Sequence, residues 1–421
     1  MAVEETPTTT APHGDARAPR THIYAALAHR DFRLLLAGNV ATQLGQWTQQ
    51  VGKGWLVYTL TQSTLQLGLV SFFMGLGMLL GAPVGGALAD RFNRRKVILA
   101  SQTALVIIAL FLAFLVLTDA IRIWHIYILA LLSGGGFATN GPSRQSLVHD
   151  LVGKRDLPNA IALNTVSMNS MRIIGPSIGG IMIGTVGIEG TFFVQAGGYV
   201  VAMILVLMMR TTPPPSDAIH DPMLQSMAAG ARYARRDRTI ALLLTIGFVS
   251  GFLGMAYMQL LPAYVGDVLK QDKGSVLGYL MTAGGIGGLL GALGVTLLGN
   301  FRWKGRLLVA AVATTGLLQL LLGGFSTLMV AIPVLAGLGA AGAITLTMTN
   351  TLLQTNVDDQ YRGRVMSLYF MLSFSLAPLG VLFGGAIAES VGLQPTIMVL
   401  GALVIAAMAW IVISSPRIRR L

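Results

Sequence analysis

Five hydrogen-bonding side chains recur at helical spacing in the first apolar stretch of this 421-residue chain. They follow one another at intervals of four, three, four and three, so they share one helix face: Asn39, Gln43, Gln46, Gln50 and Lys53. An unpaired amide is costly in hydrocarbon, so this face must meet protein or water. The pattern predicts either a cavity wall that hydrogen-bonds a solute, or hydrogen bonds between helices worth about 0.6 kcal/mol each.

Lys53 and Arg172 are the two basic residues inside predicted apolar spans, and no acid lies deep within one. A cation without a carboxylate partner costs about 2.5–3.5 kcal/mol on membrane-insertion scales, so it needs backbone carbonyls, water or an anionic guest. One interpretation is that both attract a negative or oxygen-rich substrate. The alternative is that Lys53 snorkels to the outer interface and Arg172 is a structural anchor. Asn350 and Gln354 are predicted to complete the cavity from the second half of the chain.

Catalytic chemistry finds no support in the sequence. The chain has no cysteine, and its six histidines fall in tails, in loops or near helix ends, without a His-x3-His pair. No two acids face each other within a span, and no Gly-x4-Gly-Lys-Ser/Thr loop occurs. We therefore expect no enzyme activity, no metal site and no cofactor. A membrane sensor or scaffold without transport activity stays open as an alternative.

The composition indicates an integral membrane protein. Only 11% of the residues are charged and 54% are hydrophobic, which a water-soluble chain of this length could not carry on its surface. A span needs about 20 mostly apolar residues. The sequence predicts twelve, at residues 34–58, 65–89, 97–118, 123–145, 160–186, 190–209, 239–263, 275–298, 307–325, 328–352, 365–388 and 394–414.

The basic residues set the predicted orientation. With both termini in the cytoplasm, most of the 29 lysines and arginines fall on the inner side, and the outer loops hold Arg122, Lys270 and Lys273. The net charge of +12 thus reports topology and contact with anionic lipid, and a nucleic-acid partner is not expected.

An internal repeat divides the chain. A shift of 205 residues lays Gly175-x3-Gly179-Gly180-x5-Val186-Gly187 on Gly380-x3-Gly384-Gly385-x5-Val391-Gly392. We predict a cytoplasmic tail, a six-helix bundle, a central loop, a second six-helix bundle and a second cytoplasmic tail, at residues 1–33, 34–210, 211–238, 239–414 and 415–421 respectively.

A charged hairpin between the second and third spans carries the most specific motif. Gly86-x3-Asp90-Arg91-x2-Arg94-Arg95 resembles the signature loop of the major facilitator superfamily, with Asn93 where that pattern usually has glycine. The resemblance implies that Asp90, Arg91 and Arg95 belong to a charge cluster that latches the inner gate. In the fifth span, Gly175-Pro176-Ser-Ile-Gly179-Gly180 resembles the end of the superfamily's antiporter motif. Its proline and glycines predict a bending point for alternating access.

Further stretches resemble the branch that includes bacterial enterobactin exporters and drug-efflux proteins, such as Gly54-Trp55-Leu-Val-Tyr58 and Arg362-Gly363-Arg364-Val365-Met366. The resemblance implies an all-α membrane protein of two pseudo-symmetric six-helix bundles. It also implies a proton-driven exporter of a drug-like or siderophore-like molecule in the bacterial inner membrane. The expected partners are a small-molecule substrate, protons and the lipid bilayer, and the expected state is a monomer. Uptake of a small metabolite stays an alternative.

Overall fold

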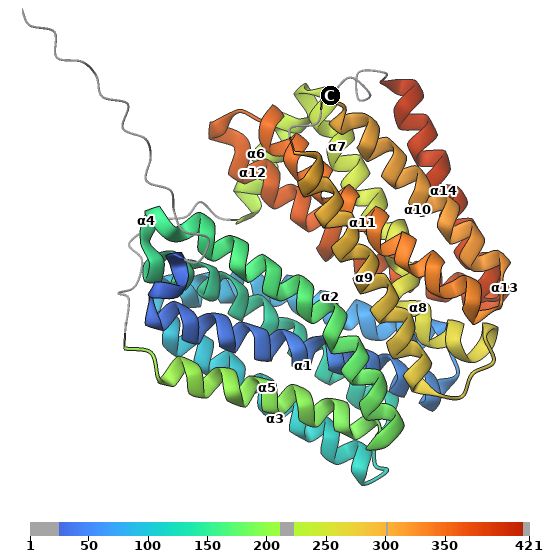
Figure 1. The fold of residues 1–421 in the computed structure, drawn as a ribbon, viewed down its shortest axis with the longest axis horizontal. Coiled ribbons are helices and arrows are strands. Elements are labelled where there is room, and N and C mark those ends of the chain that lie inside the picture. The colour runs from blue at the N-terminus through green and yellow to red at the C-terminus, as the bar shows by residue number, and fades with distance from the viewer. Residues whose placement is uncertain (1–24, 211–222, 300–301, 416–421) are drawn as a thin grey trace, which may run out of the picture.

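The computed structural model describes residues 25–210, 223–299 and 302–415, apart from the side chains of residues 89–91, 141–143, 145–146, 154 and 223–229. All regular structure in these ranges is helical, and it forms two bundles that meet at one end and diverge at the other (Figure 1). The predicted all-α class is confirmed.

The first bundle holds six elements: the 3-10 turn η1 (Ala25–Ala28), α1 (Arg30–Thr61), α2 (Thr64–Arg91), α3 (Arg94–Leu117), α4 (Ile123–Thr185) and α5 (Ile188–Leu207). We predicted two spans here, 123–145 and 160–186, with a loop between them. The interval 146–159 is helical instead of a loop, and α4 consists of two helical stretches that meet at a kink at Gly153 (φ 68°, ψ 174°). Leu147, Val148 and Val152 of this interval pack into the buried cluster of the first bundle.

The second bundle is interrupted by π-helical turns. Its elements are α6 (Met223–Arg236), α7 (Arg238–Val249), η2 (Ser250–Gly254), α8 (Ala256–Ala263), η3 (Tyr264–Val268), α9 (Gly274–Leu298), α10 (Lys304–Gly324), α11 (Leu328–Asn356), α12 (Asp359–Phe370), η4 (Met371–Ser375), α13 (Ala377–Val391) and α14 (Leu393–Ser414). The elements η2, η3 and η4 are the π-helical turns. Segments 238–268 and 359–391 are therefore long, locally widened spans. Helix α6 lies within the predicted central loop and packs on α12.

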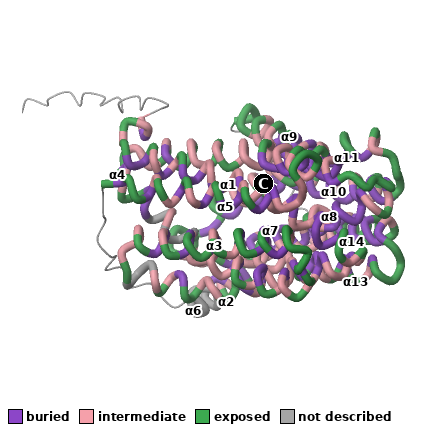
Figure 2. Tube along the Cα trace, turned by 90° about the horizontal axis from the view of Figure 1, so that it is seen from below, coloured by how far each residue is buried: buried purple, intermediate pink, exposed green. Residues whose placement is uncertain are grey.

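The helices are those of a multi-pass membrane protein. Within the described ranges, nine helical segments are long and apolar enough to cross a membrane. Helices α1 and α4 are not among the nine, so the count of twelve spans stays a prediction. Exposed residues run along both bundles (green in Figure 2). They include large apolar residues, for example Ile107, Phe111, Phe114 and Ile413. Lipid, not water, is the solvent that such a surface requires.

The glycines of the internal repeat occupy matching positions. Gly187 (φ 117°) and Gly392 (φ 90°) have the positive φ that glycine adopts without strain, and each directly precedes a helix, α5 or α14. A Cβ on Gly180 would lie 3.0 Å from the Cα of Gly278 in α9, and a Cβ on Gly385 would lie 2.5 Å from the carbonyl oxygen of Thr64 in α2. Both helices thus use a small residue to approach the opposite bundle closely.

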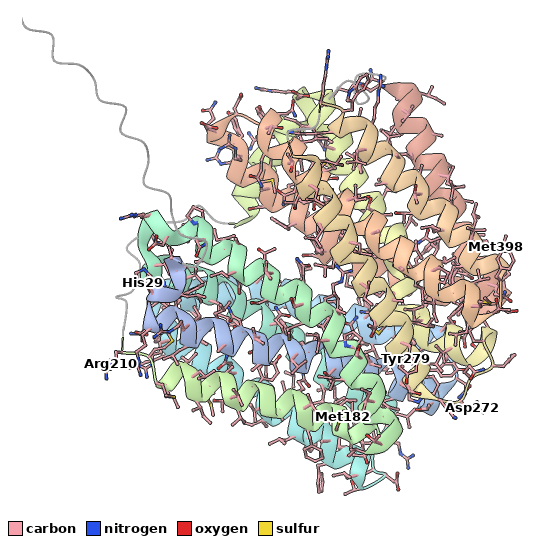
Figure 3. All side chains as sticks on the ribbon, in the orientation of Figure 1. His29, Met182, Arg210, Asp272, Tyr279 and Met398 are labelled. Atoms are coloured by element: carbon pink, nitrogen blue, oxygen red, sulfur yellow. The ribbon has the colours of Figure 1, made fainter. Side chains whose placement is uncertain are left out.

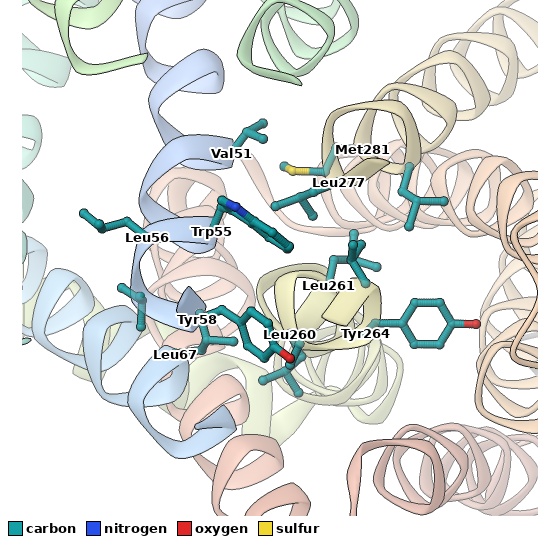
Figure 4. Packing of buried hydrophobic residues seen from close by; sticks show 14 of the residues in the cluster. Val51, Trp55, Leu56, Tyr58, Leu67, Leu260, Leu261, Tyr264, Leu277 and Met281 are labelled. Atoms are coloured by element: carbon teal, nitrogen blue, oxygen red, sulfur yellow. The ribbon is translucent and has the colours of Figure 1, made fainter. Parts of the chain in front are cut away.

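A shared hydrophobic cluster joins the two bundles at one end. It brings Val51, Trp55 and Tyr58 of the first bundle against Leu261 and Leu277 of the second (Figure 4). Each bundle has its own separate cluster toward the other end. In Figure 3, Met182 and Asp272 lie near the joined end, whereas His29 and Arg210 lie at the far end of the first bundle. The molecule is therefore closed at one end and divided at the other.

Candidate functional site

Two sets of hydrogen bonds close the joined end. The Tyr58 hydroxyl in α1 donates to Asp267 Oδ1 in η3 over 2.7 Å. Glu389 Oε2 at the end of α13 accepts hydrogen bonds from Ser63 Oγ (2.9 Å) and Thr64 Oγ1 (3.1 Å). It also accepts from the backbone N–H of Leu65 (3.2 Å). The carboxylate thus binds the first turn of α2, where a helix favours negative charge.

The glycine motif of the fifth predicted span lies in this joined region. Thr48 Oγ1 in α1 donates to the Gly175 carbonyl oxygen over 3.1 Å, and Pro176 is buried. A Cβ on Gly179 would lie 2.9 Å from the Thr48 carbonyl oxygen. Gly175 and Gly179 therefore press α4 onto α1, while Gly180 presses it onto α9.

Part of the polar row on α1 is bonded inside the first bundle. Asn39 donates to Asn164 Oδ1 in α4 over 2.9 Å and also accepts a hydrogen bond from Arg144. Gln46 donates to the hydroxyl of Tyr199 in α5 over 3.1 Å. These contacts are the hydrogen bonds between helices that the sequence predicted as one of two alternatives. Gln43 lies between them, half-buried on the same helix face.

The other part of the row faces the second bundle. Gln50 Nε2 lies 3.3 Å from Gln259 Oε1 in α8, which is a direct hydrogen bond between the two halves. Lys53 Nζ lies 3.7 Å from the sulfur of Met74 in α2. Thioether sulfur is a weak acceptor, so this contact leaves most of the donor capacity of the ammonium group unused.

Arg172 lies where the two bundles meet. Its guanidinium stacks 5.7 Å from the ring centroid of Trp47 in α1. The same side chain lines a pocket whose other walls come from α7, η2, α8, α10, α11, α12 and η4 of the second bundle. A carbonyl oxygen of Arg172 also lies 2.9 Å from where a Cβ on Gly285 of α9 would be. Arg172 is thus held against the second bundle by close helix packing.

Four buried hydroxyls among the pocket-lining residues have no hydrogen-bond partner in the described part of the chain: Ser250, Thr345, Thr349 and Ser373. Serine and threonine in helices commonly donate to a carbonyl of their own helix, as Thr315 of the same pocket does to Ala311 over 3.1 Å. A buried polar group without a partner costs about 1–3 kcal/mol. Such hydroxyls are suited to a ligand that supplies the missing partner.

Two of the π-helical turns help to form this pocket. Ser250, Gly251 and Gly254 of η2 line it, together with Ser373 and Phe374 of η4. A π turn frees a backbone carbonyl from the regular helix ladder, and such turns are frequent at functional sites. The buried amide of Gln319 in α10 accommodates η2 by donating to the carbonyl oxygens of Leu253 (3.1 Å) and Gly254 (3.2 Å).

Asn350 and Gln354 do not line this pocket. They lie one turn apart on α11, where Gln354 donates a hydrogen bond to Asn350 Oδ1. Gln354 is exposed and Asn350 is half-buried, nearer the divided end. That these two side chains line the cavity between the bundles stays a prediction.

The charged hairpin links α2 to α3. The side chains of Asp90 and Arg91 lie outside the described residues, and a Cβ on Gly86 would meet open space. Arg95 Nη2 donates to the carbonyl oxygen of Leu207 over 2.6 Å, so this cation binds the carboxyl end of α5. The neighbouring Arg94 pairs with Asp150 of α4. Both arginines thus tie α3 to helices of the same bundle.

Sequence reasoning missed the hydroxyls of the second bundle. Ser250, Thr345 and Thr349 sit in apolar helices without a conspicuous polar row, and serine and threonine are easily satisfied within a helix. The one available signal is the spacing of Thr345 and Thr349, four residues apart and therefore on one face of α11.

Known proteins resemble this chain over most of its length. The sequence model of a family described as "Transmembrane secretion effector" matches residues 21–420. The multidrug efflux pump Tap of Mycolicibacterium fortuitum is 25% identical over 397 residues, which cover 92% of this chain and 96% of that protein. The staphyloferrin A transporter of Staphylococcus aureus is 27% identical, covering 85% and 89%. The enterobactin exporter EntS of Shigella flexneri is 26% identical, covering 74% of each.

Solved structures share the fold at low sequence identity. A bacterial homologue of the human lysosomal transporter Spinster, solved in an inward-facing and unoccupied conformation, superposes with a TM-score of 0.71 at 16% identity. The match covers 93% of this chain and 98% of that one. The arrangement of two helical bundles is therefore that of a known transporter fold.

Proposed function

The chain belongs to the transmembrane secretion effector family of the major facilitator superfamily, and we propose that it exports a small organic molecule across the bacterial inner membrane by alternating access. It is a multi-pass transporter by family. The finer proposal is that export is driven by protons, that the substrate is drug-like or siderophore-like, and that the protein works as a monomer without enzyme activity.

The observation that carries the proposal is the pocket between the halves, together with bundles that are joined at one end and divided at the other. One pocket holds Arg172 from the first bundle against hydroxyls from the second. With both termini in the cytoplasm, as the basic residues predict, the divided end faces inward. The described conformation is then the inward-open state, in which an exporter takes up its substrate.

The direction of transport is supported by the relatives. One of them is an efflux pump and another is an exporter by name. Uptake stays the second candidate because the staphyloferrin A transporter carries no direction in its name. A sensor without transport is disfavoured, since the relatives named above are all transport proteins by name.

The gating proposal assigns roles to both ends. Asp90, Arg91 and Arg95 of the hairpin, with Gly86 at the start of its motif, latch the inner end when the halves close there. Gly175, Pro176, Gly179 and Gly180 form the bending region of α4. Asn39, Gln43, Gln46, Gln50 and Lys53 line the first-bundle wall of the cleft, and Asn350 with Gln354 lines the opposite wall. In the inward-open state some of these residues are bonded to their own bundle.

Transport in membrane vesicles tests the proposal. A strain that lacks the gene is first grown on antibiotics, on dyes and in iron-limited medium to find a compound to which it is sensitive. Everted vesicles that contain the protein should then accumulate this compound only when the vesicle lumen is acidified. Arg172→Gln should reduce accumulation, whereas Ser390→Ala, an exposed site bonded only to its own helix, should not. Accumulation that is independent of the pH gradient would refute proton coupling. Accumulation in right-side-out vesicles instead would mean that the protein imports the compound and would refute export.

A further inference from the structure

The pocket that combines Arg172 with Ser250, Thr345 and Thr349 has no assigned ligand. We propose that it binds the anionic, oxygen-bearing end of a small organic molecule, with the charge on Arg172 and the remaining oxygens on the hydroxyls of the second bundle. This inference rests on the proposed transport function, because it names the chemical class of the substrate. It concerns the C-terminal bundle, to which the polar row on α1 does not belong.

The charge balance of the pocket selects an anion. Arg172 is the only charged side chain among its described lining residues, and no carboxylate lines it. Its guanidinium lies over the ring of Trp47, a contact that uses the face of the group and leaves its N–H donors available. A planar fork of donors matches the two oxygens of a carboxylate. A cationic ligand would meet repulsion and find no acid to neutralise it.

The hydroxyls add donors on the opposite wall. Thr345 is 5% exposed and Thr349 is 0% exposed, so neither can rely on bulk water for its hydrogen bond. In a helix, the threonine side chain divides between two χ1 rotamers, so its hydroxyl can turn from one direction to another at little cost. Ser250 lies in η2, and a Cβ on Gly251 would overlap the carbonyl of Ser373 in η4. The two π turns therefore fix each other, and with them the position of Ser250.

The rest of the lining suits an apolar body. Met255, Met258, Leu338 and Phe374 line the same pocket, and methionine adapts to irregular shapes. The fitting ligand is thus an amphiphilic acid: a carboxylate or phenolate with neighbouring oxygens, carried on an aromatic or aliphatic frame.

The chain contains no cysteine, so a single introduced cysteine is the only thiol in the protein and no native cysteine has to be replaced first. In purified full-length Thr349→Cys protein, we compare the labelling rates of a negatively charged sulfonatoethyl thiosulfonate and a positively charged trimethylammonioethyl thiosulfonate. The anionic reagent should be favoured, and the ratio of the two rates should fall at least about fivefold when Arg172→Gln is added, from Coulomb attraction across a partly wet pocket. Arg172→Lys should restore most of the preference.

Ser390→Cys is the control site. It is exposed at the end of α13 and does not line the pocket, so its ratio of labelling rates should not respond to Arg172→Gln. Each variant is checked by size-exclusion chromatography and thermal unfolding. Equal loss of preference at both sites, no dependence on Arg172 at Thr349→Cys, or no labelling of Thr349→Cys by either reagent would overturn the proposal.

A matched pair of ligands then tests the chemistry directly. Salicylate and salicylamide have the same ring and hydroxyl, but only salicylate is an anion. Salicylate should slow the labelling of Thr349→Cys, and salicylamide at the same concentration should not. The difference should disappear with Arg172→Gln and shrink with Thr345→Val. Thr245→Val, whose hydroxyl donates to Ala241 within α7, should leave it unchanged. Equal protection by both compounds would refute an anion site.

These outcomes separate the site from the transport function. Charge-selective labelling without accumulation of any compound in vesicles would leave the anion site standing and refute the transporter. Accumulation in vesicles without charge-selective labelling would leave the transporter standing and refute this site.

Discussion

Replacing Glu389 by glutamine should open the joined end of the molecule. Glu389 Oε2 accepts hydrogen bonds from Ser63, Thr64 and the Leu65 N–H, so one carboxylate ties α13 of the second bundle to α2 of the first. Glutamine keeps a carbonyl oxygen of similar shape but loses the negative charge. The contact should therefore weaken without leaving a cavity.

The size of the effect follows from the three hydrogen bonds. Hydrogen bonds to charged groups contribute about 1.5–3 kcal/mol when buried, but Glu389 is exposed, so each must be discounted to roughly 0.5 kcal/mol. Loss of the charge from the first turn of α2 removes about 0.3–1 kcal/mol more. The total of about 1.8–2.5 kcal/mol corresponds to a roughly 20- to 70-fold larger ratio of open to closed molecules at this end.

Spin labels report this ratio directly. Ala120, in the turn between α3 and α4, and Ser326, between α10 and α11, are exposed and lie on opposite bundles. With a spin-labelled cysteine at each position, pulsed electron paramagnetic resonance measures the distribution of distances between the two bundles at the joined end. The Glu389→Gln protein should show a longer-distance population that is minor or absent in the parent protein.

A matched control separates the loss of the Glu389 contact from a general loss of stability. Ser390 is the next residue of α13, is exposed, and donates within its own helix to the Ile387 carbonyl. Ser390→Ala should leave the distance distribution unchanged. The reasoning is wrong if Glu389→Gln gives the parent distribution, or if it shifts the distribution toward shorter distances.

Three further substitutions test other contacts. Gly180→Val should force α4 away from α9 at a cost of about 1–3 kcal/mol, slowing transport in vesicles while the protein still inserts. Tyr58→Phe removes the hydrogen bond to Asp267, which stabilises the closed form of the joined end by about 0.5–1.5 kcal/mol. The open population, measured with the same spin-label pair, should rise accordingly. Tyr233→Ala removes the ring stacked on Tyr361 at 4.4 Å and should speed hydrogen exchange in α6, from a loss of about 1 kcal/mol.

Positions of the helices followed well from hydropathy, but their interruptions did not. The sequence predicted spans at 239–263 and 365–388, and the structure extends both and inserts the π turns η2, η3 and η4. A π turn contains one more residue than a regular helical turn, and its free carbonyl groups are bonded by a neighbouring helix. In η2 this neighbour is α10, whose Gln319 amide donates to the Leu253 carbonyl oxygen. Apolar composition does not encode that neighbour.

The glycines of the repeat were more informative than the polar row. Gly187 and Gly392 were paired by sequence alone, and both adopt positive φ before the following helix. Backbone conformation is local, so a glycine pattern predicts it. The partner of Gln46 is Tyr199, more than 150 positions along the chain, and only the packing of α1 on α5 brings the two together. Spacing therefore predicted which residues share a face, but not what that face meets.

The division of the proposed anion site between the bundles gives a reason for substrate to affect conformation. Arg172 belongs to α4 of the first bundle, whereas Ser250, Thr345 and Thr349 belong to the second. Rocking of one bundle against the other changes the distance between the cation and the hydroxyls. An anion that binds both groups is bound most tightly in the conformation in which the distance between the cation and the hydroxyls matches the length of the anion. Such a ligand shifts the equilibrium by its difference in affinity between conformations, and a ligand held by one bundle alone shifts nothing. A site shared between halves therefore lets a small acid promote the conformational change that carries it.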